Sequence, residues 1–259
     1  MDLGLGYGTD YYGYRKKFAV LVPSTNTTVE YEYNRMAPAG VVVATRGCVI
    51  PPFHVTNEEE FVGMVKAIGA ATEQGLRDSL TLKPDHVIFG YSAETFWDGK
   101  ERSDREFARY NAIAQEIAGC NITFGAQAIQ DALACYPGTH RIGVVSPYMP
   151  IGNSMVEKFM SDIGYEVVRM GGHSSPGPVE IAHEPFAKSR ELVRQVDGDD
   201  VDLILQAGTN LAFAPLAGKL EAELGKPVLA INTITFWHAL RTNGIPDRIE
   251  GFGSLLSEF

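Results

Sequence analysis

The sequence predicts an α/β fold of two pseudo-symmetric Rossmann-like lobes, each built on a parallel sheet, with an active-site cleft between them. Three observations lead to this prediction. Strand-like apolar runs alternate with helical stretches, as in right-handed βαβ units. Four of the runs recur later in the chain, at offsets between about 105 and 125 residues. The run from His86 to Gly90 is continuous rather than alternating, which is typical of a parallel strand buried on both faces.

The internal repeat consists of four pairs of strand-like runs. They are 20–24 with 143–147, 41–43 with 166–168, 87–90 with 203–206, and 122–124 with 228–230. Each run ends in small or hydroxyl-bearing residues and precedes a helical stretch. Open α/β sheets bind ligands at the carboxyl ends of their strands, so two facing halves would place their chemistry in the cleft between them.

The first half is predicted to contain four strands and the helices between them. The first strand runs from Phe18 to Val22. Thr27-Thr28-Val29-Glu30 then has the form of a capping box, which predicts a helix from Thr27 to about Met36. The other expected elements are strands at 41–45, 86–90 and 122–124, and helices at 56–84, 105–118 and 126–135. The charged and aromatic stretch 91–104 carries no predicted element.

The second half repeats this order. We expect strands at 141–145, 165–169, 201–206 and 227–231, and helices at 150–163, 185–196, 211–224 and 233–242. Gly225 stands where a helix stop belongs. A loop rich in Gly, Ser and Pro covers 171–178.

The predicted domain organisation has three parts. Residues 1–17 form an N-terminal arm, residues 18–130 together with 226–259 form the first lobe, and residues 131–225 form the second. The arm contains Gly4, Gly6 and Gly8, a spacing that suggests a dinucleotide loop. That fingerprint must follow a strand, whereas these glycines precede the first one, so this interpretation is rejected.

Composition excludes several classes of function. The net charge is −10 with dispersed acidic residues, whereas nucleic-acid binding needs a basic stripe. We find no apolar run long enough to span a membrane and no signal-peptide pattern at the N-terminus. The three cysteines fit no disulfide framework or zinc site, and no metal-ligand cluster or cofactor motif is found. The expectation is a cytoplasmic protein without a metal or cofactor, and a homo-oligomer, as is common at this size.

Four strand-to-helix junctions should converge on the cleft, and all are rich in hydroxyl and amide side chains. They are Pro23-Ser24-Thr25-Asn26-Thr27-Thr28, Gly90-Tyr91-Ser92-Ala93-Glu94-Thr95, Ser146-Pro147-Tyr148, and Ala207-Gly208-Thr209-Asn210. Free backbone N–H groups at helix starts bind anions, and the same donors would stabilise an enolate. The alternative is that these residues only cap helices.

The segment 20–30, Val-Leu-Val-Pro-Ser-Thr-Asn-Thr-Thr-Val-Glu, resembles the opening motif of the maleate cis–trans isomerases. These enzymes belong to the aspartate/glutamate racemase superfamily, as do the arylmalonate decarboxylases. The likeness continues at Gly90-Tyr91, at 145–149 and, more weakly, at 224–228. The family fold, two α/β halves with the site between them, agrees with the repeat.

The resemblance assigns roles to several residues. It implies that Asn26 and Tyr148 hold substrate carboxylates and that Ser24 and Thr25 lie in the same loop. Arg46 resembles a family arginine, although a surface ion pair is an equal alternative. The full set of predicted substrate-binding residues is Ser24, Thr25, Asn26, Arg46, Tyr148, Gly208, Thr209 and Asn210.

The chain departs from the family at its cysteines. Family members place a cysteine after the third strand, after the seventh, or after both. Here the first position falls on Ser92 or Ala93 and the second on Gly208. We therefore predict that Cys48, Cys120 and Cys135 are not catalytic.

The candidate catalytic residues are Glu94, Tyr91 and Ser92. A carboxylate partly desolvated in the cleft would have a pKa near neutrality and could act as a general acid or base. The alternative for Glu94 is an ordinary acidic residue in a first helical turn. Tyr91 could donate a hydrogen bond to an oxyanion.

Three functions follow from these residues. The first is a cofactor-independent decarboxylase or isomerase that acts on a small carboxylate or dicarbonyl compound through an enolate-like anion. The second is a hydrolase of a small amide, imide or lactone, with a water activated by Glu94. The third is a non-catalytic sensor of small carboxylates.

Overall fold

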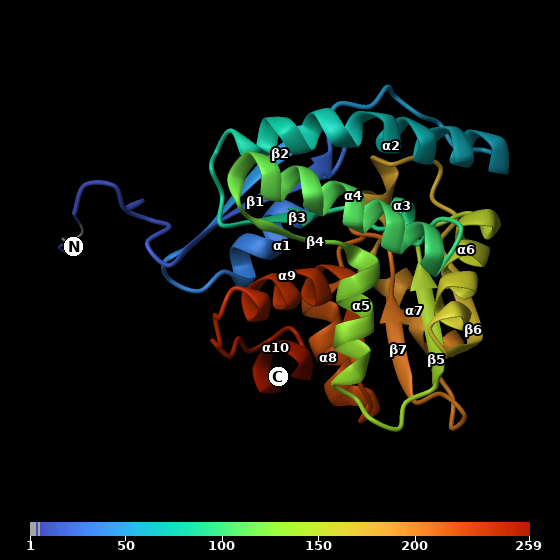
Figure 1. Ribbon diagram of the computed structural model, residues 1–259. Coiled ribbons are helices and arrows are strands. Elements are labelled where there is room, and N and C mark those ends of the chain that lie inside the picture. Colours follow the sequence, from blue (N-terminus) through green and yellow to red (C-terminus); the bar gives the residue numbers. More distant parts are fainter. Residues whose placement is uncertain (1–3, 5) are drawn as a thin grey trace.

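The computed structural model describes residues 4 and 6–259, and it is built around two four-stranded parallel sheets (Figure 1). The first sheet has the order β2-β1-β3-β4 and the second the order β6-β5-β7-β8. The strands are β1 (Lys16–Pro23), β2 (Val41–Cys48), β3 (His86–Phe89), β4 (Asn121–Thr123), β5 (Arg141–Ser146), β6 (Glu166–Gly172), β7 (Leu203–Gln206) and β8 (Val228–Ala230). The predicted α/β fold of two parallel-sheet lobes is confirmed.

The internal repeat is present in the sheet topology. β1 and β5 hold the same place in their sheets, as do β2 and β6, β3 and β7, and β4 and β8. Each of the four predicted pairs of runs falls on one of these pairs of strands. The central strands are buried along most of their length, which explains why their sequences are continuously apolar.

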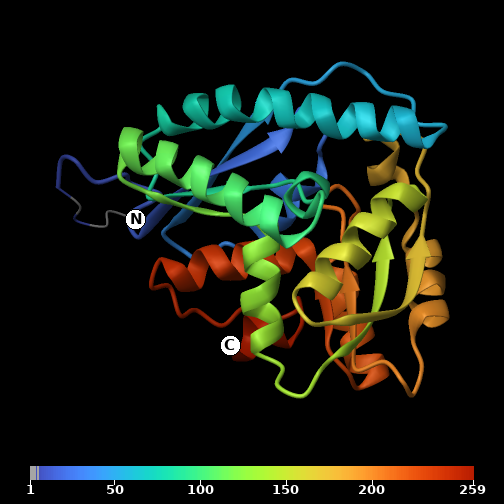
Figure 2. The ribbon, with the colours of Figure 1, turned by 45° about the vertical axis from the view of Figure 1, so that its right-hand side comes forward.

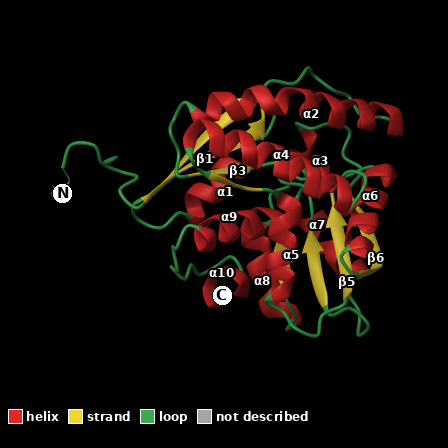
Figure 3. Cartoon of the chain, in the orientation of Figure 1, coloured by secondary structure: helices red, strands yellow, loops and turns green. Residues whose placement is uncertain are grey.

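Helices cover both sheets, as the turned view and the colouring by secondary structure show (Figures 2 and 3). They are α1 (Thr28–Met36), α2 (Glu58–Leu80), α3 (Ala93–Phe96), α4 (Lys100–Ala118), α5 (Gly125–Ala134), α6 (Pro150–Asp162), α7 (Phe186–Val196), α8 (Ala214–Leu224), α9 (Ile231–Thr242) and α10 (Ser254–Glu258), with a 3₁₀ turn at Glu180–His183. Of the helices in the described residues, none has both the length and the apolar content to cross a membrane.

The structure corrects two local predictions. The stretch 91–104 contains α3 and the first turn of α4, separated by a turn in which Asp98 and Gly99 have positive φ. The predicted capping box does not form, because the Thr27 side chain makes no cap hydrogen bond. Asn26 replaces it: its Oδ1 accepts hydrogen bonds from the N–H groups of Thr28 and Val29, both at 3.0 Å.

Helix α9 follows the last strand of the second sheet, yet it packs against β3, β4, α1 and α5. Its first ten residues, 231–240, are all buried. In Figure 1, α9 lies beside α1 and α5. The domain bounds given above remain a prediction, as does the role of the arm, whose Tyr7 and Tyr12 side chains are exposed.

Candidate active site

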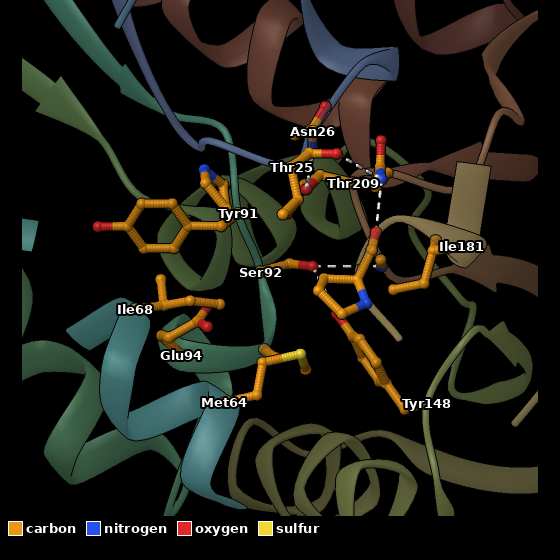
Figure 4. A pocket seen from close by; sticks show the side chains of 15 residues that line it. Thr25, Asn26, Met64, Ile68, Tyr91, Ser92, Glu94, Tyr148, Ile181 and Thr209 are labelled. Atoms are coloured by element: carbon orange, nitrogen blue, oxygen red, sulfur yellow. Dashed lines mark hydrogen bonds between the residues drawn. The ribbon is translucent and has the colours of Figure 1, made fainter. Parts of the chain in front are cut away.

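A small cavity of about 50 Å³ lies where the loops after β1, β3, β5 and β7 meet (Figure 4). All four predicted junctions contribute to it, two from each sheet. Its lining consists of Pro23, Thr25, Asn26, Met64, Ile68, Tyr91, Ser92, Ala93, Glu94, Tyr148, Pro178, Ile181, Gly208, Thr209 and Asn210. One water needs roughly 10–15 Å³ by this measure, so the cavity suits a ligand of only a few heavy atoms.

The polar centre of the cavity is a hydrogen-bonded group of three residues. The Ser92 hydroxyl lies 2.7 Å from the Tyr148 hydroxyl and accepts a hydrogen bond from the Gly208 N–H at 3.2 Å. Gly208 has φ +99°, and a Cβ there would lie 2.3 Å from Pro147 Cδ, so only glycine fits. This hydrogen bond joins the loop after β3 to the loop after β7.

Asn26, Thr209 and Asn210 form one wall of the cavity and join the two lobes; Figure 4 shows Asn26 and Thr209 in its upper part. The Asn26 side-chain amide donates to Thr209 Oγ1 at 3.3 Å, and Thr209 donates to Gly90 O at 2.9 Å. Asn210 Oδ1 accepts from the N–H groups of Thr27 and Thr28. The N–H groups at the start of α1 are thus bonded within the protein, and the expectation that they are free for an anion is wrong. The donors at this wall are side chains.

Glu94 lines the cavity on the side of Ile68 and Met64, across from the polar group (Figure 4). The side chain is partly exposed, but its Oε1 atom is buried and has no hydrogen-bond partner within the described residues. Burial raises the pKa of Glu94 to about 7, against the opposing effects of its own backbone N–H and the charge of Arg102. A carboxyl group with this pKa can both give and accept a proton at neutral pH.

Three predicted site residues do not point their polar groups into the cavity. Tyr91 contributes its ring, but its hydroxyl donates to Thr72 Oγ1 at 2.8 Å and points away from Ser92. Arg46 is exposed near the end of the edge strand β2 and donates to Thr45 O. The hydroxyl of Ser24 accepts from Ile50 N–H and is absent from the cavity lining. Tyr91 as an oxyanion donor and Arg46 and Ser24 as direct ligands are therefore corrected.

No cysteine lines the cavity among the described residues. Cys48 is the last residue of β2, not a loop residue as expected, and its sulfur faces the backbone of Gly75 on α2. Burial, with the charges of Glu94 and Asp78, raises the pKa of its thiol to about 12. Cys48 is thus held as a neutral thiol in the protein interior, where it is a poor nucleophile.

The segment between β6 and α7 covers the cavity with Pro178 and Ile181. Asn210 holds it by donating to Pro178 O at 2.8 Å. A second anchor is His173, which lies 2.9 Å from Glu184 and 3.1 Å from Ser189. The spacing of these three resembles a catalytic triad, but none of them lines the cavity, so their role is to fix the covering segment.

Sequence reasoning missed Glu32. This buried residue on α1 accepts hydrogen bonds from Phe213 N–H and Ala214 N–H, both at 3.0 Å, and from the Asn232 amide at 2.7 Å. Asn232 in turn donates to Thr209 O at 2.9 Å. The carboxylate of Glu32 therefore caps α8 and positions the Thr209 loop from the opposite lobe. Its position on the apolar face of α1 was the available signal.

The described residues contain no group of three or more His, Cys, Asp or Glu side chains that could hold a metal ion. Trp97 and Asp98, between α3 and α4, line a neighbouring pocket.

Comparisons with known proteins agree on one group of relatives. No protein-family model matches the chain. It is 23% identical over 250 residues to a maleate isomerase of Geobacillus stearothermophilus, with 93% of this chain and 97% of the relative covered. It is 24% identical over 242 residues to a maleate isomerase of Pseudomonas putida, with 92% and 95% covered.

Solved structures show the same fold. The maleate cis-trans isomerase of Nocardia farcinica bound to TRIS superimposes with a TM-score of 0.84 at 20% identity, over 94% of this chain and 98% of that one. A mutant of that enzyme with a covalently bound succinylcysteine intermediate gives 0.82 at 20% identity, over 94% and 99%. Arylmalonate decarboxylase gives 0.70 at 17% identity, over 93% and 98%. These similarities confirm the resemblance that the sequence motifs indicate.

Proposed function

The chain resembles the maleate isomerases and arylmalonate decarboxylases over nearly its whole length, and from this premise we propose that it is a cofactor-independent isomerase or decarboxylase of a small carboxylate. The observation that supports this proposal most strongly is the cavity itself. It combines neutral hydroxyl and amide donors from both lobes with one carboxyl group, Glu94, whose pKa is close to 7.

The proposed chemistry passes through an enolate-like anion. In a decarboxylation, the bond between the α-carbon and one carboxylate breaks, CO₂ leaves, and the electron pair delocalises onto the remaining carboxylate. One hydrogen of the Ser92 and Tyr148 hydroxyls is used in the bond between them, and the other would be donated to the charge that develops there. The α-carbon then takes a proton from Glu94. In an isomerisation at a saturated α-carbon, the ionised Glu94 would remove the α-proton, and the resulting Glu94 carboxyl group would return it to the planar anion.

Thiol chemistry is not part of this proposal. A succinylcysteine intermediate, as found in the Nocardia farcinica isomerase, needs a thiolate beside the substrate. By the resemblance, Ser92 or Ala93 and Gly208 stand where the relatives have cysteines, and Cys48 lies outside the cavity lining. Proton transfer by Glu94 is the chemistry that the lining residues support instead.

The proposed function can be tested by incubating the protein in D₂O with maleate-, malonate- and imide-like compounds and following the products by NMR. We expect loss of CO₂ or isomerisation of a small carboxylate, with deuterium incorporated at the α-carbon. The Cys48→Ala variant should turn over the same compound at a similar rate, because Cys48 lies outside the cavity lining.

The other outcomes of this experiment would overturn the proposal. Opening of an imide ring with uptake of ¹⁸O from labelled water would identify a hydrolase. Thermal stabilisation by a carboxylate without turnover would identify a sensor. Loss of activity in Cys48→Ala, with the fold intact, would restore a thiol mechanism.

The Tyr148 hydroxyl should contribute to turnover through the group it forms with Ser92. We expect Tyr148→Phe to lower kcat/KM by roughly 10- to 100-fold, because one of several preorganised donors is lost. The pKa of Tyr148 is raised by burial, so the hydroxyl stays protonated across the working pH range. Steady-state kinetics on the substrate found above would measure the effect.

Tyr136→Phe is the matched control for this prediction. Its hydroxyl also makes one hydrogen bond to a serine, at 2.8 Å to Ser254, but it lies outside the cavity lining. Kinetics of Tyr136→Phe should equal those of the native protein. If kcat/KM of Tyr148→Phe equals that of Tyr136→Phe, the Tyr148 hydroxyl does not stabilise the charge of the enolate-like anion.

A further inference from the structure

Glu94 lies between two cavities rather than in one. It lines the small active-site cavity and also a larger neighbouring pocket of about 470 Å³ between α2 and α4. We call the larger one the outer pocket; its lining includes Lys66, Gly69, Ala70, Trp97, Arg102 and Glu106. Tyr91 is the other residue common to both linings, and its hydroxyl is bonded to Thr72. Glu94 is therefore the shared ionisable group that is able to carry a proton at neutral pH.

The outer pocket is more polar than the active-site cavity, and part of its lining is exposed to solvent. Lys66, Gly69 and Ala70 on its α2 side are exposed. The small side chains of Gly69 and Ala70 leave the space between the two helices unfilled. Water can thus reach Glu94 from the outer pocket, without passing Pro178 and Ile181 on the side of the covering segment.

Arg102 is placed to influence Glu94 from the outer pocket. Its guanidinium donates to Trp97 O at 3.4 Å, and it has no ion-pair partner in the described part of the chain. Arg109, in the same pocket, is instead paired with Glu73 and Glu106. The ionisable groups around Glu94 come from several elements: Arg102, Glu106, Arg109 and Tyr110 on α4, Lys66 on α2, Asp98 in the turn before α4, Tyr91, Tyr148 and Cys48.

We propose that the outer pocket is the route by which Glu94 exchanges its proton with solvent, and that Arg102 is a positioning residue that favours the ionised form of Glu94 on this route. The inference rests on the proposed function and deepens it. When the α-carbon takes a proton from Glu94, the O–H bond breaks and a carboxylate remains. That carboxylate then takes a proton from water in the outer pocket, and the released hydroxide leaves through the same opening, which restores the acid.

The first test narrows the outer pocket with Ala70→Trp. We expect kcat to fall about tenfold or more with KM unchanged, and the solvent deuterium isotope effect on kcat to rise, because proton exchange becomes limiting. Ala108→Trp makes the same substitution at an exposed position of α4 outside the pocket lining, and its kinetics should equal those of the native protein. Native kcat and isotope effect in a folded Ala70→Trp variant would overturn the route.

The second test follows the Glu94 carboxyl directly, by ¹³C NMR titration with and without Arg102. In Arg102→Met the pKa of Glu94 should rise by roughly 0.5–1 pH unit, because a positive charge that stabilises the carboxylate is lost. Arg105→Met removes an exposed charge from the same helix and should leave the titration unchanged. If the pKa of Glu94 is unchanged in Arg102→Met, Arg102 does not favour the ionised form of Glu94.

The two tests separate this inference from the proposed function. If no compound is turned over by the native protein, the proposed function fails, and the titration still decides whether Arg102 acts on Glu94. If the native protein is active and Ala70→Trp behaves as native, the route fails and the proposed function stands.

Discussion

Glu94→Gln should lower kcat by about 10²–10⁴-fold while the protein stays folded. Glutamine has nearly the same shape, but its amide cannot give or accept a proton. Because the buried Oε1 of Glu94 has no hydrogen-bond partner in the described residues, the substitution breaks no hydrogen bond of that atom. Kinetics on the substrate identified in D₂O, with circular dichroism as a check on folding, would measure this effect.

Glu101→Gln provides the control for this variant. Glu101 is an exposed carboxylate near the start of α4, and the same substitution there should leave kcat unchanged. If Glu94→Gln keeps the native kcat, Glu94 does not transfer the proton and the proposed chemistry is wrong. A Glu94→Ala variant should regain part of its activity with added formate or acetate, which can enter through the outer pocket.

The pH dependence of stability gives an independent measure of the Glu94 environment. Its pKa is about 7 in the folded protein and has an ordinary value near 4.5 when exposed, so the folded state binds this proton more tightly than the unfolded state. This group therefore favours folding most below about pH 4.5, and the benefit is lost as the pH rises through about 7. Relative to Glu94→Gln, the native protein should lose free energy of unfolding between about pH 5 and 8.

The fold could be predicted from the sequence because its signal is local. Strands such as β3 and β7 are buried along their full length, and three consecutive apolar residues in each predict them without knowledge of their neighbours. The start of α4 could not be found in this way. Its first turn is stabilised by a Lys100–Asp104 ion pair after a positive-φ Gly99, inside a stretch whose composition resembles a loop.

The sequence indicated which loops line the cavity, but not the direction of every side chain in them. The motif around Asn26 and the positions of Tyr148 and Thr209 place those residues at the cavity. The prediction for Arg46 is wrong because this residue lies exposed on the edge strand β2 and donates to Thr45 O, outside the cavity lining. The prediction for Tyr91 is wrong because its hydroxyl points toward Thr72, a hydrogen-bond partner on α2. The directions of these side chains depend on contacts between different segments of the chain, and a pattern of residue types does not encode those contacts.

Glu32→Ala should lower the free energy of unfolding by roughly 3–4 kcal/mol, the largest effect on stability that we expect from one substitution at this site. The change leaves the N–H groups of Phe213 and Ala214 and the amide of Asn232 without their acceptor, all in the interior. Unsatisfied buried donors cost about 1–3 kcal/mol each, partly offset where water enters the space. Chemical denaturation would give the value.

Glu30→Ala is the matched control, two residues away on the same helix. Glu30 is exposed and accepts one hydrogen bond, from the Thr45 hydroxyl, so its loss should change the free energy of unfolding by less than about 0.5 kcal/mol. Glu32→Gln should fall between the two, since its amide oxygen can still accept from both backbone N–H groups while its NH₂ faces Asn232. A Glu32→Ala protein as stable as Glu30→Ala would show that α8 and the Thr209 loop are held by packing alone. In that case the carboxylate of Glu32 would have no part in fixing the cavity.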